Sequence, residues 1–144
     1  MTQKITLILL LLIASLPAQA RDTKHLFSIQ DALISAAFNG RLDSNIKLYF
    51  GDTSDGKITK QLGDFTSNRK TNAAGKSDHK SCDWALLSAL LTLQKRAVTE
   101  GGNAVINIRS FYKKNELSST TKYECHAGAI MAGVALKGTV VRIE

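Results

Sequence analysis

Two cysteines and two histidines are the side chains of this sequence whose types best suit chemistry. The thiols of Cys82 and Cys125 can bond to each other, or they can join His79 and His126 as ligands of zinc or copper. Neighbouring residues of a strand point to opposite faces, so Cys125 and His126 reach one ion only if the strand breaks there. Two cysteines most often pair in an oxidising compartment, and closing the loop between these two would stabilise the fold by roughly 4 kcal/mol. The sequence therefore favours a disulfide, with the metal site as the alternative.

A second group of residues combines aromatic rings with cations. The run Phe111–Lys114 contains two aromatic residues and two lysines, and Lys122 lies across the turn that follows. Such surroundings suit sugar rings or the phosphates of lipid headgroups, although an ordinary exposed hairpin would show the same pattern. Further cations lie in the polar segment 66–80, which the sequence predicts to be a mobile loop. The candidate binding patch is Arg69, Lys70, Lys76, Lys80, Phe111, Lys113, Lys114 and Lys122.

The sequence contains no complete catalytic or nucleotide-binding motif. Gly51–Lys57 matches the start of the phosphate-binding loop G-x-x-x-x-G-K-[ST], but Ile58 replaces the hydroxyl that would hold magnesium, and the residues that follow alternate like a strand. The pattern therefore predicts a turn and no ATP site. The motifs G-x-S-x-G, H-E-x-x-H and C-x-x-C are absent as well. We expect Glu116 and Glu124 on a solvated face, and we predict no cofactor.

The elements that must position these residues follow from hydrophobic spacing. Ser28 can cap a helix that Gly40 ends, and a second helix is apolar on most of its girth, which indicates burial. The expected helices are Ser28–Asn39 and Cys82–Glu100, and the expected strands are Asn45–Phe50, Ile58–Phe65, Ala104–Tyr112, Thr121–Ala127 and Val134–Ile143. The first two strands should form a hairpin. The predicted fold is α+β, with a mostly antiparallel sheet of about five strands packed by one long buried helix and a short N-terminal helix.

The first twenty residues have the pattern of a secretory signal peptide. A lysine precedes an apolar run that is too short for a transmembrane helix, and Ala18-Gln19-Ala20 is typical of a cleavage site. Cleavage after Ala20 would leave residues 21–144 as a single periplasmic or secreted domain without a transmembrane segment. Loss of one lysine would lower the net charge from +7 to +6. For an exported basic protein, anionic envelope surfaces are expected partners before nucleic acid.

Three segments carry a resemblance to a known family. They are Leu62–Phe65, the stretch from Cys82 through Glu100–Val105, and Tyr123–Ala129. Together they resemble a family of small exported bacterial proteins whose members often carry the label "excinuclease ATPase subunit". The chain is also distantly similar to the domain of the lipoprotein that senses envelope stress for the Rcs phosphorelay, and to proteins labelled as heavy-metal-binding. The likeness to the stress sensor implies that Cys82 and Cys125 form a disulfide.

These observations lead to two hypotheses about function. The first is a non-enzymatic exported protein that binds an envelope protein or an anionic envelope surface through the basic patch. The second is a metal-binding or metal-stress protein that uses His79, Cys82, Cys125 and His126.

Overall fold

The computed structural model describes residues 20–144, so the predicted signal peptide lies outside the described residues except for Ala20. The strands are β1 (Thr23–Ser28), β2 (Lys47–Phe50), β3 (Ile58–Asn72), β4 (Ala104–Tyr112), β5 (Asn115–Leu117), β6 (Lys122–Ala127) and β7 (Met131–Ile143). The helices are α2 (Ile29–Leu33) and α3 (Asp78–Glu100). No helix within residues 20–144 is long and apolar enough to cross a membrane.

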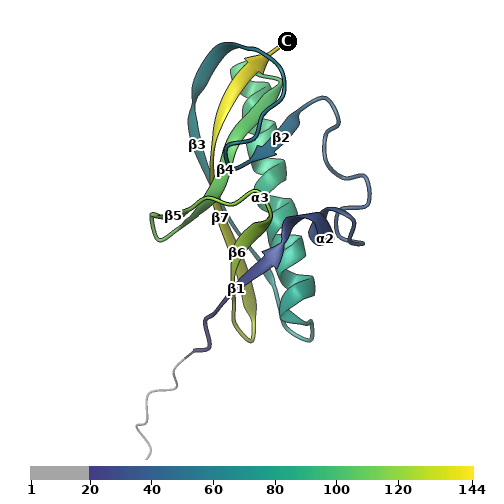
Figure 1. Cartoon of the computed structure of the whole chain (residues 1–144). Helices are drawn as coiled ribbons and strands as arrows, with labels where there is room; N and C mark the ends of the chain where they lie inside the picture. Colours follow the sequence, from purple (N-terminus) through teal and green to yellow (C-terminus); the bar gives the residue numbers. More distant parts are fainter. Residues whose placement is uncertain (1–19) are drawn as a thin grey trace, which may run out of the picture.

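A single sheet of seven strands is built around β7 (Figure 1). One edge of β7 pairs with β3 along its whole length, while the other edge pairs first with β6 and then with β4. β1 extends the sheet beyond β6, and β2 and β5 both pair with β4. The fold is α+β and mostly antiparallel, as predicted. The number of strands was underestimated, and the β2–β4 pair is parallel.

Helix α3 covers one face of this sheet (Figure 1). It begins at Asp78, because the Ser77 hydroxyl accepts a hydrogen bond from the Lys80 amide, and it ends where Gly101 adopts a left-handed φ of 80°. Leu86 and Leu90 are completely buried between the helix and the sheet. The helix therefore starts one turn before Cys82, and its apolar girth is explained by burial, as predicted.

The predicted mobile loop over residues 66–80 was wrong. β3 continues to Asn72, and its pairing with β7 runs without a break from Asp64 to Asn72. Only residues 73–77 connect β3 to α3. Because β3 is an edge strand with mostly exposed side chains, its second half lacks the apolar alternation by which strands are recognised.

The expected hairpin of the first two strands is also wrong, since β2 pairs with β4 and β3 pairs with β7. The turn between β2 and β3 instead lets β3 pass to the far edge of the sheet. Both strands begin at or close to the predicted residue, but a pattern along the chain does not identify the partner of a strand.

The N-terminal helix is shorter than the prediction of Ser28–Asn39. Ser28 caps it as expected, yet α2 ends at Leu33 and the chain then turns so that Phe38 enters the core. Arg41 donates hydrogen bonds to the carbonyls of Ala36 and Ala37, which helps to hold this turn. The preceding strand β1 was not predicted, and it pairs with β6 over its whole length.

Candidate binding site

The face of the sheet opposite α3 carries no helix. Side chains of alternate residues reach this uncovered face, among them Glu124 and His126 of β6, whereas Cys125 between them is buried beneath the helix. On β3 the stem of Lys70 lies over Gly133, where an added Cβ would come within 3.4 Å of Lys70 Cγ. Small residues on β7 thus leave room above the uncovered face.

A hollow of about 660 Å³ lies on this face, at the end of the molecule where the chain enters the fold. Its walls come from separate parts of the chain: segments 20–22 and 128–133, Lys70 of β3, Tyr112 of β4 and His126 of β6. Apolar groups form much of the wall in segment 128–133. The hollow therefore combines an apolar surface with a few polar side chains, which is typical of a ligand site.

One wall of the hollow is a stacked pair of rings. Tyr112 and His126 lie with ring centroids 3.4 Å apart and planes 10° apart. His126 Nε2 lies 2.6 Å from Glu124 Oε1, and Nδ1 lies 3.5 Å from an Asp22 oxygen that belongs to the N-terminal segment. The Tyr112 hydroxyl donates to Asp22, and burial together with that carboxylate raises the pKa of Tyr112. The two rings and both carboxylates are thus held in a fixed arrangement.

The exposure of the Glu124 side chain differs from the prediction. We expected it on a solvated face, but its side chain is only 7% exposed and lies between His126 and Lys24, whose Nζ is 3.8 Å away. A buried carboxylate of this kind needs such partners, because desolvation of an unpaired charge is costly. Strand periodicity places Glu124 and His126 on one face, and this signal could have linked them.

Arg21 and Lys70 both line the hollow, but only Arg21 is engaged in an ion pair within the described residues. No ion pair within residues 20–144 involves Lys70, whereas Arg21 binds Asp78 with two hydrogen bonds of 2.7 and 2.9 Å and also donates to the Gly128 carbonyl. His25 lies 2.8 Å from the same carboxylate, and the two contacts hold the pKa of Asp78 well below its usual range. Arg21 thus fastens the N-terminal segment, and Lys70 stays available to an anion.

The rim of the hollow is an apolar turn between β6 and β7. Ile130 is 68% exposed and Met131 is 45% exposed. The Gly128 amide donates to the Met131 carbonyl and closes the turn, while the Ala73 amide donates to the Ile130 carbonyl. This second bond places the β3–α3 connection, with Lys76, beside the apolar turn.

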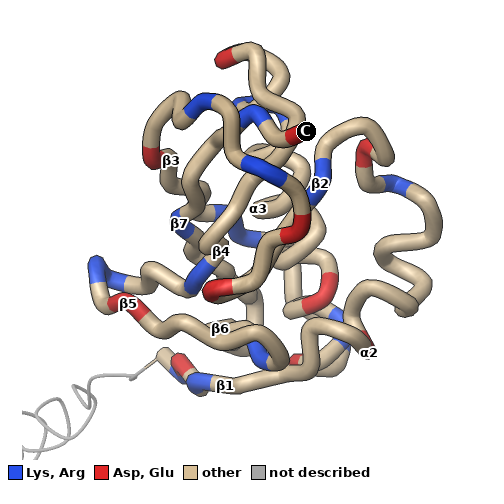
Figure 2. The backbone as a smooth tube through the Cα atoms, turned by 45° about the horizontal axis from the view of Figure 1, so that its top comes forward, with Lys and Arg blue, Asp and Glu red and all other residues tan. Residues whose placement is uncertain are grey.

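Lysines and arginines are scattered along the chain (Figure 2), and the remaining members of the predicted patch lie on separate elements. Arg69 lies on the helix side, where its Nε donates to Thr92, and Lys122 pairs with Ser28 at the far end of β6. Phe111 lies beneath the Lys137 ammonium at 5.0 Å. Lys76 and Lys80 flank the start of α3, and Lys113 and Lys114 form the tip of the β4–β5 hairpin. The patch is therefore not one continuous surface, and of its members only Lys70 lines the hollow.

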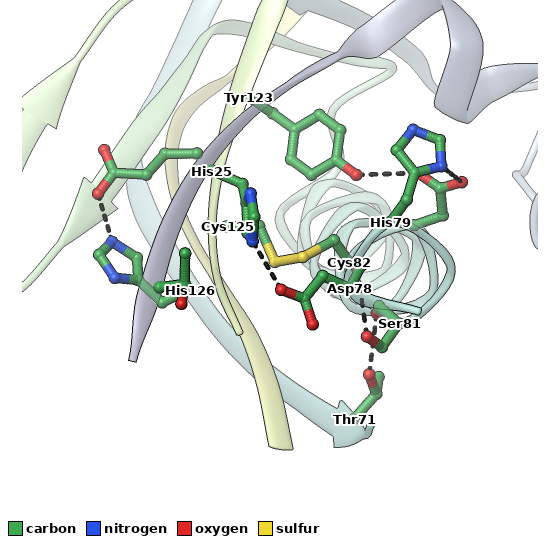
Figure 3. Close-up of a disulfide and its surroundings, with 12 residues drawn as sticks. His25, Thr71, Asp78, His79, Ser81, Cys82, Tyr123, Cys125 and His126 are labelled. Atoms are coloured by element: carbon green, nitrogen blue, oxygen red, sulfur yellow. Dashed lines mark hydrogen bonds and ion pairs between the residues drawn. A yellow bond between two sulfur atoms is a disulfide. The ribbon is translucent and has the colours of Figure 1, made fainter. Parts of the chain in front are cut away.

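The expected bond between the two cysteines is present in the structure (Figure 3). Cys82 and Cys125 form a disulfide with Cα atoms 5.9 Å apart, and both are completely buried. The bond joins the first turns of α3 to the middle of β6. Next to it the Tyr123 hydroxyl donates to Asp83 over 2.8 Å. This side of β6 thus fixes the helix, while the other side forms the wall of the hollow.

The four residues of the alternative metal site are not brought together in this disulfide form. His79 Nδ1 lies 3.7 Å from Asp83 on the helix side of the sheet, while His126 lies on the uncovered face. Both sulfur atoms are engaged with each other. Within residues 20–144, no group of three or more His, Cys, Asp or Glu side chains could hold a metal ion.

Fold and site together define a small disulfide-bonded α+β protein with an apolar-rimmed hollow that contains Lys70. No protein-family model matches the chain, and no curated protein matches it either. The resemblances drawn from its short motifs therefore remain expectations, and the site carries the argument about function.

Proposed function

We propose that the protein is an exported, non-enzymatic binding protein that docks on the anionic surface of a lipid membrane. The observation that carries this proposal is the ammonium of Lys70, which has no ion-pair partner within residues 20–144, beside an apolar rim, with Lys76 on the neighbouring β3–α3 connection. Headgroup phosphates carry negative charge and would bind these positively charged lysines. The Cys82–Cys125 disulfide supports an oxidising compartment such as the periplasm.

The charge balance at this end favours an anionic surface. Its carboxylates already have partners: Asp22 contacts His126, Asp78 binds Arg21, and Asp83 accepts from a tyrosine. Lys70 and Lys76 have no ion-pair partner within the described part of the chain. Both ammonium groups are therefore available to anionic headgroups, to which their charge attracts them.

The ring pair supports binding rather than catalysis. Both nitrogens of His126 face carboxylates, at 2.6 Å for Glu124 and 3.5 Å for Asp22. A general base needs a nitrogen within hydrogen-bond reach of the substrate proton, and here both positions are occupied. The imidazole acts instead as part of a rigid wall.

Neutralising two lysines at this end should weaken binding to anionic vesicles. A lysine near such a surface contributes about 1 kcal/mol, so Lys70→Gln together with Lys76→Gln should raise the Kd about 30-fold at low salt. The matched control is Lys57→Gln with Lys60→Gln, which removes two exposed lysines near the C-terminal end of the fold. Binding is measured by co-sedimentation with vesicles at increasing salt concentration.

The control pair should leave the Kd within about threefold of the wild-type value, because charges farther than a Debye length from the surface are screened. An equal loss of vesicle affinity in the Lys70/Lys76 variant and in the Lys57/Lys60 control would show that net charge alone attracts the protein. Absence of binding to anionic vesicles at low salt would refute the proposed function.

A further inference from the structure

We infer that the turn between β6 and β7, residues 128–131, inserts into the membrane at the level of the headgroups and upper acyl chains. This inference deepens the proposed function and rests on it. It names the membrane-contacting element and the orientation of the protein, with the N-terminal end against the lipid and the C-terminus pointing away (Figure 1).

The first argument is the exposure of two adjacent large apolar side chains. Ile130 and Met131 are 68% and 45% exposed, and Ala129 precedes them. A large part of each side chain is therefore in contact with water, and transfer into lipid would remove that apolar area from water. Exposed apolar residues that are rimmed by polar ones often mark contact with a membrane or a partner.

The second argument is that part of the backbone of the turn is already hydrogen-bonded. The Gly128 amide donates to the Met131 carbonyl, and the Ile130 carbonyl accepts from Ala73. Unsatisfied backbone groups strongly oppose entry into lipid, so these two bonds lower the cost of inserting the turn. The close approach of Arg21 also fixes the turn, since a Cβ on Gly128 would lie 2.7 Å from the Arg21 carbonyl oxygen.

The third argument is the arrangement of charge around the turn. Lys70 lies over the adjacent Gly133, and Lys76 lies on the connection that bonds to Ile130. Lysine stems can extend along an apolar surface while their ammonium groups stay at headgroup level. With Ile130 below this level, both lysines would be positioned to meet phosphates.

The fourth argument is the place where the chain enters the fold. Ala20 lines the same hollow as Met131, so the predicted signal peptide joins the domain at the end that carries the turn. The apolar run that precedes Ala20 in the sequence would therefore emerge beside the turn in a chain that keeps it.

Another exposed apolar residue provides a matched control. Ile34 follows α2 and is 81% exposed, more than Ile130. It has Asp31 nearby in the chain and does not belong to the hollow. A membrane contact driven by exposed apolar area alone would involve Ile34 as well, whereas the orientation inferred here keeps it in water.

The test uses the processed protein, whose N-terminus is first established by intact mass. Its single tryptophan, Trp84, is replaced by phenylalanine, and reporters are then introduced as Ile130→Trp or Ile34→Trp. Fluorescence is recorded with vesicles of anionic phospholipid, with and without brominated acyl chains. The Ile130→Trp emission should shift to the blue and be quenched by bromine, while the Ile34→Trp emission should not change.

A second measurement compares affinities in salt that screens the lysines. The pair Ile130→Ser and Met131→Ser should raise the Kd at least about tenfold, and Ile34→Ser should leave it unchanged. Wild-type binding with an unshifted Ile130→Trp reporter would overturn insertion and leave the electrostatic docking intact. Absence of wild-type binding at low salt would overturn both.

Discussion

Replacing both cysteines by alanine is expected to lower the free energy of unfolding by about 4 kcal/mol. The disulfide joins residues 43 positions apart, and closing a loop of that length removes a corresponding amount of entropy from the unfolded chain. Both sulfur atoms are completely buried between α3 and β6, so no solvent contact compensates for their removal. A loss of this size is a large part of the stability of a domain of this length.

Urea unfolding of Cys82→Ala with Cys125→Ala, compared with the wild type, checks this effect. Wild-type protein reduced with a thiol serves as the control, because reduction removes the cross-link and keeps both sulfur atoms. The reduced protein should account for most of the loss, and the alanine pair should add the smaller cost of two cavities. A difference below 1 kcal/mol for the alanine pair would contradict a stapling role for this bond.

Replacing Tyr123 by phenylalanine should lower the free energy of unfolding by about 2 kcal/mol, because it removes a hydrogen bond to a buried carboxylate. The Tyr123 hydroxyl donates to Asp83 over 2.8 Å, and both side chains are buried. The substitution keeps the ring and its packing next to the disulfide. The matched control is Tyr112→Phe, whose hydroxyl donates to the exposed Asp22, and it should cost less than about 1 kcal/mol.

The pH dependence of the free energy of unfolding provides a second test of the Tyr123–Asp83 hydrogen bond. Burial and the Asp83 carboxylate raise the pKa of Tyr123, so the native state keeps the phenol proton at a pH where the unfolded chain releases it. Wild-type stability should therefore fall as the pH rises above about 10, the pKa of an unfolded tyrosine, and Tyr123→Phe should show a smaller fall. Two outcomes would contradict the stabilising role of the Tyr123–Asp83 hydrogen bond. One is an equal dependence of stability on pH in the wild type and Tyr123→Phe, and the other is a free energy of unfolding of Tyr123→Phe within about 0.5 kcal/mol of the wild-type value.

The elements that patterns could predict are those whose signal lies in their own residues. The apolar girth of α3 requires burial, and the apolar residues around Ile106 and Ile108 identify β4, although an irregularity at Asn107 places the two isoleucines in different clusters. The expected oxidising compartment and the presence of two cysteines in the sequence were sufficient to favour pairing of Cys82 with Cys125. In each case the environment that shapes the element is written in its sequence.

The elements that were missed depend on partners distant in the chain. The second half of β3 is polar because its side chains face water, and only β7 makes it a strand. β1 likewise needs β6 beside it. Helix α2 stops at Leu33 because Phe38 must turn into the core, a demand that local spacing does not reveal.

The binding site was predicted only in part. The prediction included Lys70, but Lys122 lies at the far end of β6, and on the β4–β5 hairpin Lys113 comes only near the hollow, with its ammonium 5.3 Å from the centre of the Tyr112 ring. The apolar turn at Ile130 was overlooked, although Gly128-Ala-Ile-Met between two strands is an unusual turn because it lacks polar residues. The positions of cations along the chain do not reveal this hollow, because its lining residues come from five separate segments.

Amide hydrogen exchange with and without anionic vesicles would identify the surface that binds the membrane. Binding as described would slow exchange in segments 73–77 and 128–131, which lie side by side at the N-terminal end of the fold, and leave the β2–β3 connection unchanged. Protection of the β2–β3 connection or of α2 instead, or no change anywhere in the presence of vesicles, would contradict the assignment of this end as the membrane-binding surface.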